Sequence, residues 1–110
     1  MGILLLSKKA TKGEIGEIVK HFQGYIKIVV DIEKELLCAG ADRHVDEEKI
    51  LLDQGSKQQD LWGGGIDTNS GEIDYNSMIN LRPKSDNPSR DILSIEIRKK
   101  FDQVVTKILR

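Results

Sequence analysis

The amino-acid sequence predicts a single α+β domain, in which three helices pack on one face of a mainly antiparallel sheet made of two β-hairpins. Stretches with apolar residues at helical spacing alternate with stretches of period two, and turn residues join neighbouring extended stretches into hairpins. No repeat or low-complexity run divides the chain, so residues 1–110 are expected to form one domain. The expected order is strand, helix, strand, strand, helix, strand, strand, helix.

The chain is expected to open with a strand and a helix. Residues 3–6 are a short apolar run suited to a buried strand. Thr11 and Glu14 have the spacing of a capping box, which predicts a helix over residues 12–23. Apolar residues follow at helical spacing, so this helix is expected to bury one stripe of its surface.

A hairpin is expected next. Residues 25–32 alternate between apolar and polar side chains, which predicts a strand with one strongly apolar face. A short turn near residues 33–34 returns the chain as a second strand over residues 35–41. These two strands should pair antiparallel.

The second helix is expected to begin at Asp46, because Asp is a good N-cap and acidic residues in the first turn suit the helix dipole. Val45 and Ile50 would then form a hydrophobic staple across this end. Gly55 stands where a terminating glycine belongs.

A second hairpin and a last helix complete the expected fold. Residues 69–71 are turn residues between two extended stretches, of which the second, residues 72–82, predicts a long return strand. Pro83 should end that strand. Ser94 is expected to cap a helix that keeps its apolar spacing to the end of the chain.

The glycines at 63–65 do not match a phosphate-binding loop, because neither a Gly-Lys-Ser/Thr motif nor a helix follows them. They predict instead a close backbone approach or a bulge beside Trp62, which is interpreted as a core anchor. Cys38 has no base within its motif and is interpreted as a small buried hydrophobe rather than a nucleophile.

Composition narrows the classes of function. The formal charge of -1 argues against the basic surface that nonspecific nucleic-acid binding requires. The apolar run at residues 3–6 is too short for a signal peptide or a membrane span, which need roughly 7 to 15 and about 20 residues. With a single cysteine, the sequence predicts a cytoplasmic protein; no cofactor is predicted.

Residues 82–90 carry the densest group of polar side chains, directly after a predicted strand end. The planar fork of arginine suits a phosphate or carboxylate. The sequence therefore predicts an anion-binding loop, with these candidate residues: Arg82, Lys84, Ser85, Asn87, Ser89 and Arg90. The same pattern also fits a loop held by its own hydrogen bonds, in which nearby aspartates pair with the arginines.

Other polar residues give further candidates. A secondary polar site is predicted from Asp31, Ser56, Gln59 and Asp74. His44 and Asp60 are the candidates for proton transfer if the protein is an enzyme. His44 and Asp46 also resemble part of a metal site, but no second His or Cys stands at a ligand spacing, so no metal is predicted.

The segment HVDEEKILLDQGSKQQDLWG, followed by SMINLRP and NPSR, resembles a family of small prokaryotic domains of about this length whose function is unassigned. The resemblance spans nearly the whole chain and is carried by these residues: Val29, Val30, Asp31, His44, Asp46, Gly55, Ser56, Gln59, Asp60, Leu61, Trp62, Gly63, Ile79, Arg82, Pro83, Asn87, Ser89 and Arg90. It implies a shared fold and no chemistry.

The function expected from these observations is a non-enzymatic binding or interaction domain with a polar anion-binding loop. The alternative is a small hydrolase or transferase, in which Arg82 and Arg90 hold an anionic or phosphorylated substrate and His44 or Asp60 moves a proton. A homodimer, an anionic small molecule and a protein partner are all open as partners, whereas a membrane or nucleic acid is not expected. A concave pocket that joins His44 to the arginines would favour the enzyme.

Overall fold

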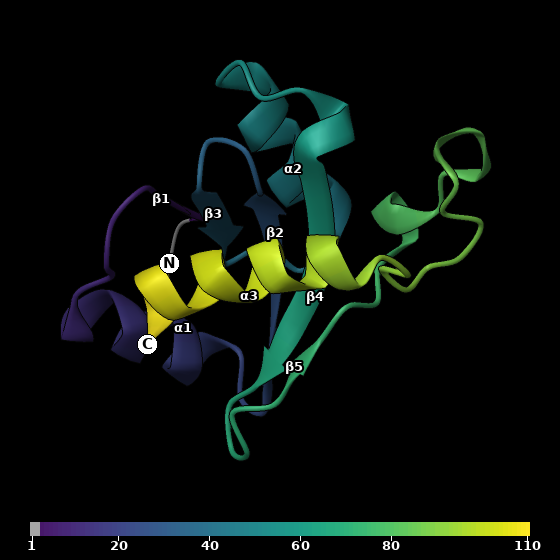
Figure 1. Ribbon diagram of the computed structural model, residues 1–110. Helices are drawn as coiled ribbons and strands as arrows, with labels where there is room; N and C mark the ends of the chain where they lie inside the picture. Colours follow the sequence, from purple (N-terminus) through teal and green to yellow (C-terminus); the bar gives the residue numbers. More distant parts are fainter. Residues whose placement is uncertain (1–2) are drawn as a thin grey trace.

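One antiparallel sheet of five strands, in the order β1-β3-β2-β4-β5, forms the centre of the protein (Figure 1). The computed structural model describes residues 3–110 and, within them, every side chain except that of Ser85. The strands are β1 Leu4–Leu6, β2 Tyr25–Asp31, β3 Leu36–Ala39, β4 Leu61–Asp67 and β5 Ile73–Asp74. The helices are α1 Lys12–His21, α2 His44–Asp53 and α3 Ile95–Leu109. Fold class and element order are confirmed.

Helices cover both faces of this sheet, so the expectation that all three pack on one face is wrong. On one face, α1 and α3 bury a core that includes Ile28, Val30 and Phe101. On the other face, α2 packs through Leu51 against Val29 and neighbouring residues. The physical reason is that Val29 of β2 and Leu36 and Cys38 of β3 point away from the face that holds Ile28 and Val30, because successive strand residues point to opposite faces, so these apolar side chains must be covered as well.

The glycines of β4 are a close backbone approach, as the sequence predicts. A Cβ at Gly64 would collide with the main-chain carbonyl of Asp74, and one at Gly65 would collide with the ring of Tyr25. At Gly63, a Cβ would lie 2.6 Å from the Cβ of Ser77. The absence of side chains here lets other residues lie directly on the surface of β4.

Two of the three predicted helix starts are confirmed. The capping box of Thr11 and Glu14 opens α1, and the Ser94 side chain accepts from the Ile97 N–H at the start of α3. Gly55, with φ 102°, also ends α2 as expected. Its N–H bonds Leu52 O at 3.0 Å, which is part of a Schellman arrangement.

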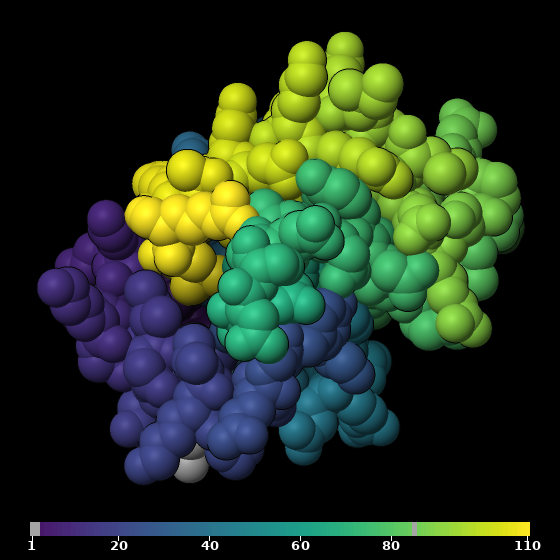
Figure 2. All heavy atoms as spheres, turned by 90° about the horizontal axis from the view of Figure 1, so that it is seen from below, coloured from purple at the N-terminus to yellow at the C-terminus, as the bar shows by residue number. Residues whose placement is uncertain are grey.

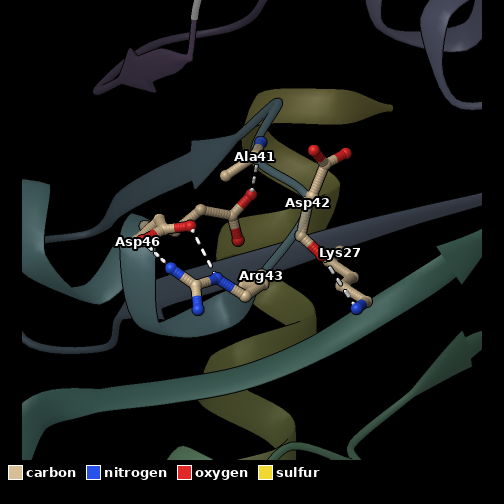
Figure 3. Close-up of polar contacts among 6 residues, drawn as sticks. Lys27, Ala41, Asp42, Arg43 and Asp46 are labelled. Carbon is tan, nitrogen blue, oxygen red and sulfur yellow. Dashed lines mark hydrogen bonds and ion pairs between the residues drawn. The ribbon is translucent and has the colours of Figure 1, made fainter.

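The predicted start of α2 is wrong. The helix begins at His44, and Arg43 occupies the N-cap without a side-chain hydrogen bond that caps a backbone N–H of the first turn. Asp46 lies inside this turn, where its carboxylate pairs with the Arg43 guanidinium at 3.1 Å instead of capping (Figure 3). Val45 lies within the helix and is 49% exposed, so it forms no staple. The first N–H groups of α2 therefore lack a side-chain cap.

The long return strand predicted over residues 72–82 is also wrong. Only Ile73–Asp74 pairs with β4, and the chain then forms a 3₁₀ turn, η2, over Met78–Asn80. The Ser77 hydroxyl accepts from the Ile79 N–H and so caps this turn. A local side-chain bond of this kind competes with strand pairing, although the alternation of side chains resembles a strand.

Candidate functional site

The polar residues around η2 hold the chain against the open edge of β4. The Asn80 carboxamide bonds both the N–H and the carbonyl of Gly63, at 2.8 and 2.9 Å. Its amide nitrogen also donates to the carbonyls of Tyr75 and Arg90, both at 2.9 Å. Asn80 is fully buried and was not among the predicted site residues. Its role is structural.

Arg82 continues this contact along β4. Its guanidinium donates to the main-chain carbonyls of Ile79, Gln59 and Leu61, and it lies over the Trp62 ring with 4.3 Å between Cζ and the ring centroid. Burial lowers the pKa of Arg82, although nearby carboxylates oppose this. Three of its five N–H donors are therefore directed at the protein's own backbone.

The rest of the predicted anion-binding loop divides into residues that bond the loop and residues that face solvent. Asn87 is buried, and its carboxamide donates to three carbonyls, including Asn80 O at 2.7 Å. The Ser89 hydroxyl accepts from the Asp91 N–H. Lys84 and Arg90 are exposed, while the side chain of Ser85 lies outside the described residues. Anion binding by Lys84 and Arg90 stays a prediction.

The secondary polar residues are only partly brought together. The Ser56 hydroxyl donates to the fully buried Asp31 carboxylate at 2.6 Å, and that carboxylate also accepts two N–H groups from the following turn. Gln59 supplies a carbonyl to Arg82, as described above. Asp74 lies apart from these residues in β5, where it interacts with Tyr25 and, electrostatically, with His44.

The two candidates for proton transfer lie at different places along β4. Asp60 precedes the strand, next to Asp31 and Glu33; burial, then these two acids, raise its pKa. His44 lies over the middle of the strand, where its Nε2 is 2.7 Å from Gly64 O. Because a carbonyl only accepts, Nε2 carries the hydrogen. The structure thus does not place His44 with Asp60 or with Arg82.

His44 instead lies in a hollow between the start of α2 and η2. The hollow has a volume of about 260 Å³ and seven lining residues: Lys27, Arg43, His44, Val45, Ser77, Met78 and Ile79. Two of these residues, Val45 and Met78, are 49% and 59% exposed to solvent. Among the described residues that line it, two are cations and none is a carboxylate. We refer to these seven residues as the α2 hollow.

Backbone and side-chain contacts fix the polar groups of the α2 hollow. Lys27 Nζ donates to the Asp42 carbonyl at 2.9 Å. Figure 3 shows Lys27 reaching the segment between β3 and α2, which carries Asp42, while Arg43 of the same segment turns toward Asp46. The His44 ring lies against β4. If Gly63 carried a Cβ, that atom would lie 3.2 Å from His44 Cδ2, so a larger residue at position 63 would crowd the ring. Burial lowers the pKa of His44, so its imidazole is neutral at neutral pH.

Glu47 lies on the inner side of α2, next to the segment between β3 and α2 that carries Ala41 and Arg43. It is fully buried; its Oε2 accepts from the Ala41 N–H at 3.2 Å, and its Oε1 has no hydrogen-bond partner within residues 3–110. Burial raises the pKa of Glu47 to about 9, against the Ala41 bond and the charge of Lys27. At neutral pH the carboxyl is therefore protonated, and Glu47 carries no negative charge that would offset the positive charge of Lys27.

Sequence reasoning missed most of the α2 hollow. Among its residues, only His44 is a site candidate from the sequence, for proton transfer. The other polar residues lie far apart in the sequence: Lys27 is in β2, Arg43 at the start of α2 and Ser77 in the loop before η2. One signal was available: three successive glycines in a strand indicate that side chains from elsewhere lie on its surface. It does not say which side chains these are.

Two kinds of site have no support in the part of the chain that the structure describes. No group of three or more His, Cys, Asp or Glu residues is arranged to hold a metal ion. No helix is long and apolar enough to cross a membrane. The Cys38 thiol is fully buried, and burial, followed by the nearby Glu47, raises its pKa to about 12, which fits its interpretation as a hydrophobe.

Comparison with known proteins gives one match. The sequence model of a family described as "Protein of unknown function (DUF5674)" matches residues 4–108. No curated protein and no solved structure matches.

Proposed function

The chain belongs to the DUF5674 family, whose function is unknown, and we propose that it is a non-enzymatic binding domain that recognises an acidic segment of a partner protein. The α2 hollow is the proposed binding site. The observation that carries this proposal is the combination of exposed apolar side chains with two cations and no lining carboxylate among the described residues; Arg43, one of the two cations, is paired with Asp46 outside the lining. A partner with an apolar side chain next to carboxylates complements both features.

The size of the α2 hollow favours one anchoring side chain over a whole small-molecule ligand. Its volume of about 260 Å³ is below the range of roughly 300 to 1,000 Å³ typical of ligand pockets. Val45 and Met78 extend the apolar surface beyond the hollow itself. A peptide can insert one apolar side chain and lay its neighbours over this rim.

The geometry supports binding better than catalysis. His44 donates its Nε2 hydrogen to a main-chain carbonyl, and the structure gives no hydrogen bond between it and Ser77, the one hydroxyl of the hollow. A serine nucleophile needs such a bond to its base. The buried free thiol of Cys38 fits a reducing compartment, which supports the cytoplasm as the location.

The test uses two short synthetic peptides, acetyl-Glu-Leu-Glu-Glu-amide and acetyl-Lys-Leu-Lys-Lys-amide, titrated into the ¹⁵N-labelled protein and followed by NMR. The acidic peptide should shift the amide signals of His44, Val45 and Met78, and the basic peptide should not. Arg43→Gln should weaken the acidic peptide several-fold, since it removes a lining cation and leaves the Asp46 carboxylate without its ion-pair partner. Added salt should weaken it as well.

Lys49→Gln is the matched control, because Lys49 is an exposed cation on the same helix and does not line the hollow. This variant should bind the acidic peptide as the parent does. Equal binding of the two peptides, or an equal loss in Lys49→Gln and Arg43→Gln, would contradict the proposal.

A further inference from the structure

A second hollow lies on the opposite side of the sheet from the α2 hollow. It is formed where α1, the turn between β4 and β5, and the end of α3 converge, and Figure 2 shows these three segments meeting on one face. Its volume is about 190 Å³. Ile18, Ile26 and Ile66 are its most buried lining residues, and Val19, which is 39% exposed, also lines it. We refer to it as the α1 hollow.

The lining determines what the α1 hollow can hold. Most of its lining is aliphatic, from Ile15, Ile18, Val19, Ile26, Ile66 and Leu109. For comparison, an engineered apolar cavity of about 150 Å³ in another protein stays dry and binds benzene. The α1 hollow therefore has room for an apolar group about as large as a benzene ring or a short alkyl chain.

The charged groups that line the α1 hollow are Arg110 and Asp67. Arg110 donates to the Gly71 carbonyl, and within residues 3–110 the structure gives it no ion pair with a carboxylate. The Asp67 carboxylate instead accepts the N–H groups of Asn69 and Ser70, at 2.8 and 3.0 Å, so it is bonded to its own turn. Arg110 is thus the group available to an anion.

We infer that the α1 hollow binds a small monocarboxylic acid, with the apolar tail among the isoleucines and the carboxylate at Arg110. This inference is independent of the proposed function, since the two hollows share no residue. The tail would gain the burial energy of its apolar surface. The carboxylate would gain a charge-assisted hydrogen bond from the guanidinium.

The test compares hexanoate with 1-hexanol, which has the same tail and no charge. Hexanoate titrated into the ¹⁵N-labelled protein should shift the amide signals of Val19, Ile66 and Gly71, and 1-hexanol should shift the same signals with an affinity several-fold lower. Arg110→Gln should reduce the affinity for hexanoate to that of 1-hexanol and leave 1-hexanol unaffected.

Val19→Phe should fill the hollow and weaken both compounds by at least about tenfold. Because Val19 is partly exposed on a helix surface, the variant is expected to fold, and its spectrum checks this. Leu52→Phe is the matched control, since it places the same side chain at a helix position that is 38% exposed and lines neither hollow, and it should leave hexanoate binding unchanged. Shifts absent from the α1 hollow, or unchanged binding in Val19→Phe, would overturn the site; equal affinities of the two compounds for the parent protein would overturn the carboxylate contact.

Discussion

The Asn80 side chain pairs with Gly63 as a peptide group of a neighbouring strand would, accepting from its N–H at 2.8 Å and donating to its carbonyl at 2.9 Å. β5 pairs with β4 only at Gly65 and Ile66, so within residues 3–110 this edge of β4 has no strand beside it near Gly63, whose other edge pairs with β2. A side-chain amide carries a donor and an acceptor in one plane, as a peptide does, and so meets the hydrogen-bonding requirement of that edge.

Asn80→Ala should therefore lower the free energy of unfolding by more than about 3 kcal/mol, since each buried group left without a partner costs about 1–3 kcal/mol. Urea unfolding measures this loss, and hydrogen exchange at the Gly63 amide should become faster. Asn76→Ala is the control, because the exposed Asn76 carboxamide makes one side-chain bond, to Asp91. A loss as small in Asn80→Ala as in Asn76→Ala would contradict the structural role of Asn80.

Arg82 and Arg90 should respond differently to substitution. Arg82→Ala removes bonds to three carbonyls and is expected to cost about 1–3 kcal/mol in urea unfolding. Arg90→Ala changes an exposed side chain and should stay within about 0.5 kcal/mol. Equal losses in both variants would show that Arg82 does not hold β4.

Phosphate tests whether Arg90 also binds anions, as the sequence predicts. If it does, millimolar phosphate should raise the melting temperature of the protein above that in chloride at equal ionic strength, and Arg90→Ala should abolish the difference. The same melting temperature in both salts would rule out this use of the loop.

Glu47 should make the protein less stable as the pH rises. Its carboxyl keeps its proton in the folded state up to a pKa of about 9, whereas in the unfolded chain it loses the proton near 4.5. The folded state thus binds more protons between these values, and the free energy of unfolding should fall by up to about 1.4 kcal/mol per pH unit in this window.

Glu47→Gln should remove this slope, because glutamine keeps an acceptor for the Ala41 N–H without an ionisable proton. Urea unfolding from pH 4 to 9 should show the variant more stable than the parent at the alkaline end. Glu17→Gln, at an exposed position of α1, should keep the parent slope. A parent protein whose stability is flat across this range would contradict the buried, protonated state of Glu47.

Two glycines should respond in opposite directions to alanine. Gly16 lies within α1 and a Cβ there meets nothing within 4 Å, so Gly16→Ala should stabilise the protein by about 1 kcal/mol. Gly64→Ala would drive a Cβ into the Asp74 carbonyl and separate β4 from β5, and should lower the melting temperature by several degrees. Thermal unfolding of both variants measures these effects; stabilisation by Gly64→Ala would contradict the close approach.

Local patterns were sufficient to predict the order of the strands and helices, the first hairpin and the starts of α1 and α3, because side-chain periodicity and caps such as Thr11 and Ser94 act within a few residues. The start of α2 was mispredicted since Asp46 has the right chemistry for a cap but pairs with Arg43. The strand after Ile73–Asp74 was mispredicted because a local Ser77 bond outweighs the alternation. The α2 hollow could not be predicted, since its residues come from three separate parts of the chain.

The hydrogen bond from Ala10 N to Ile108 O, at 2.8 Å, joins the segment between β1 and α1 to the last turn of α3. Nearly the whole chain lies between these two residues. During synthesis on a ribosome, α1 can cover only part of the sheet face that holds Ile28 and Val30, and the rest of this face stays exposed until Phe101 and the other residues of α3 have emerged. A nascent chain that ends before α3 should consequently be captured by chaperones that recognise exposed apolar surface, and a chain that includes all of α3 should not.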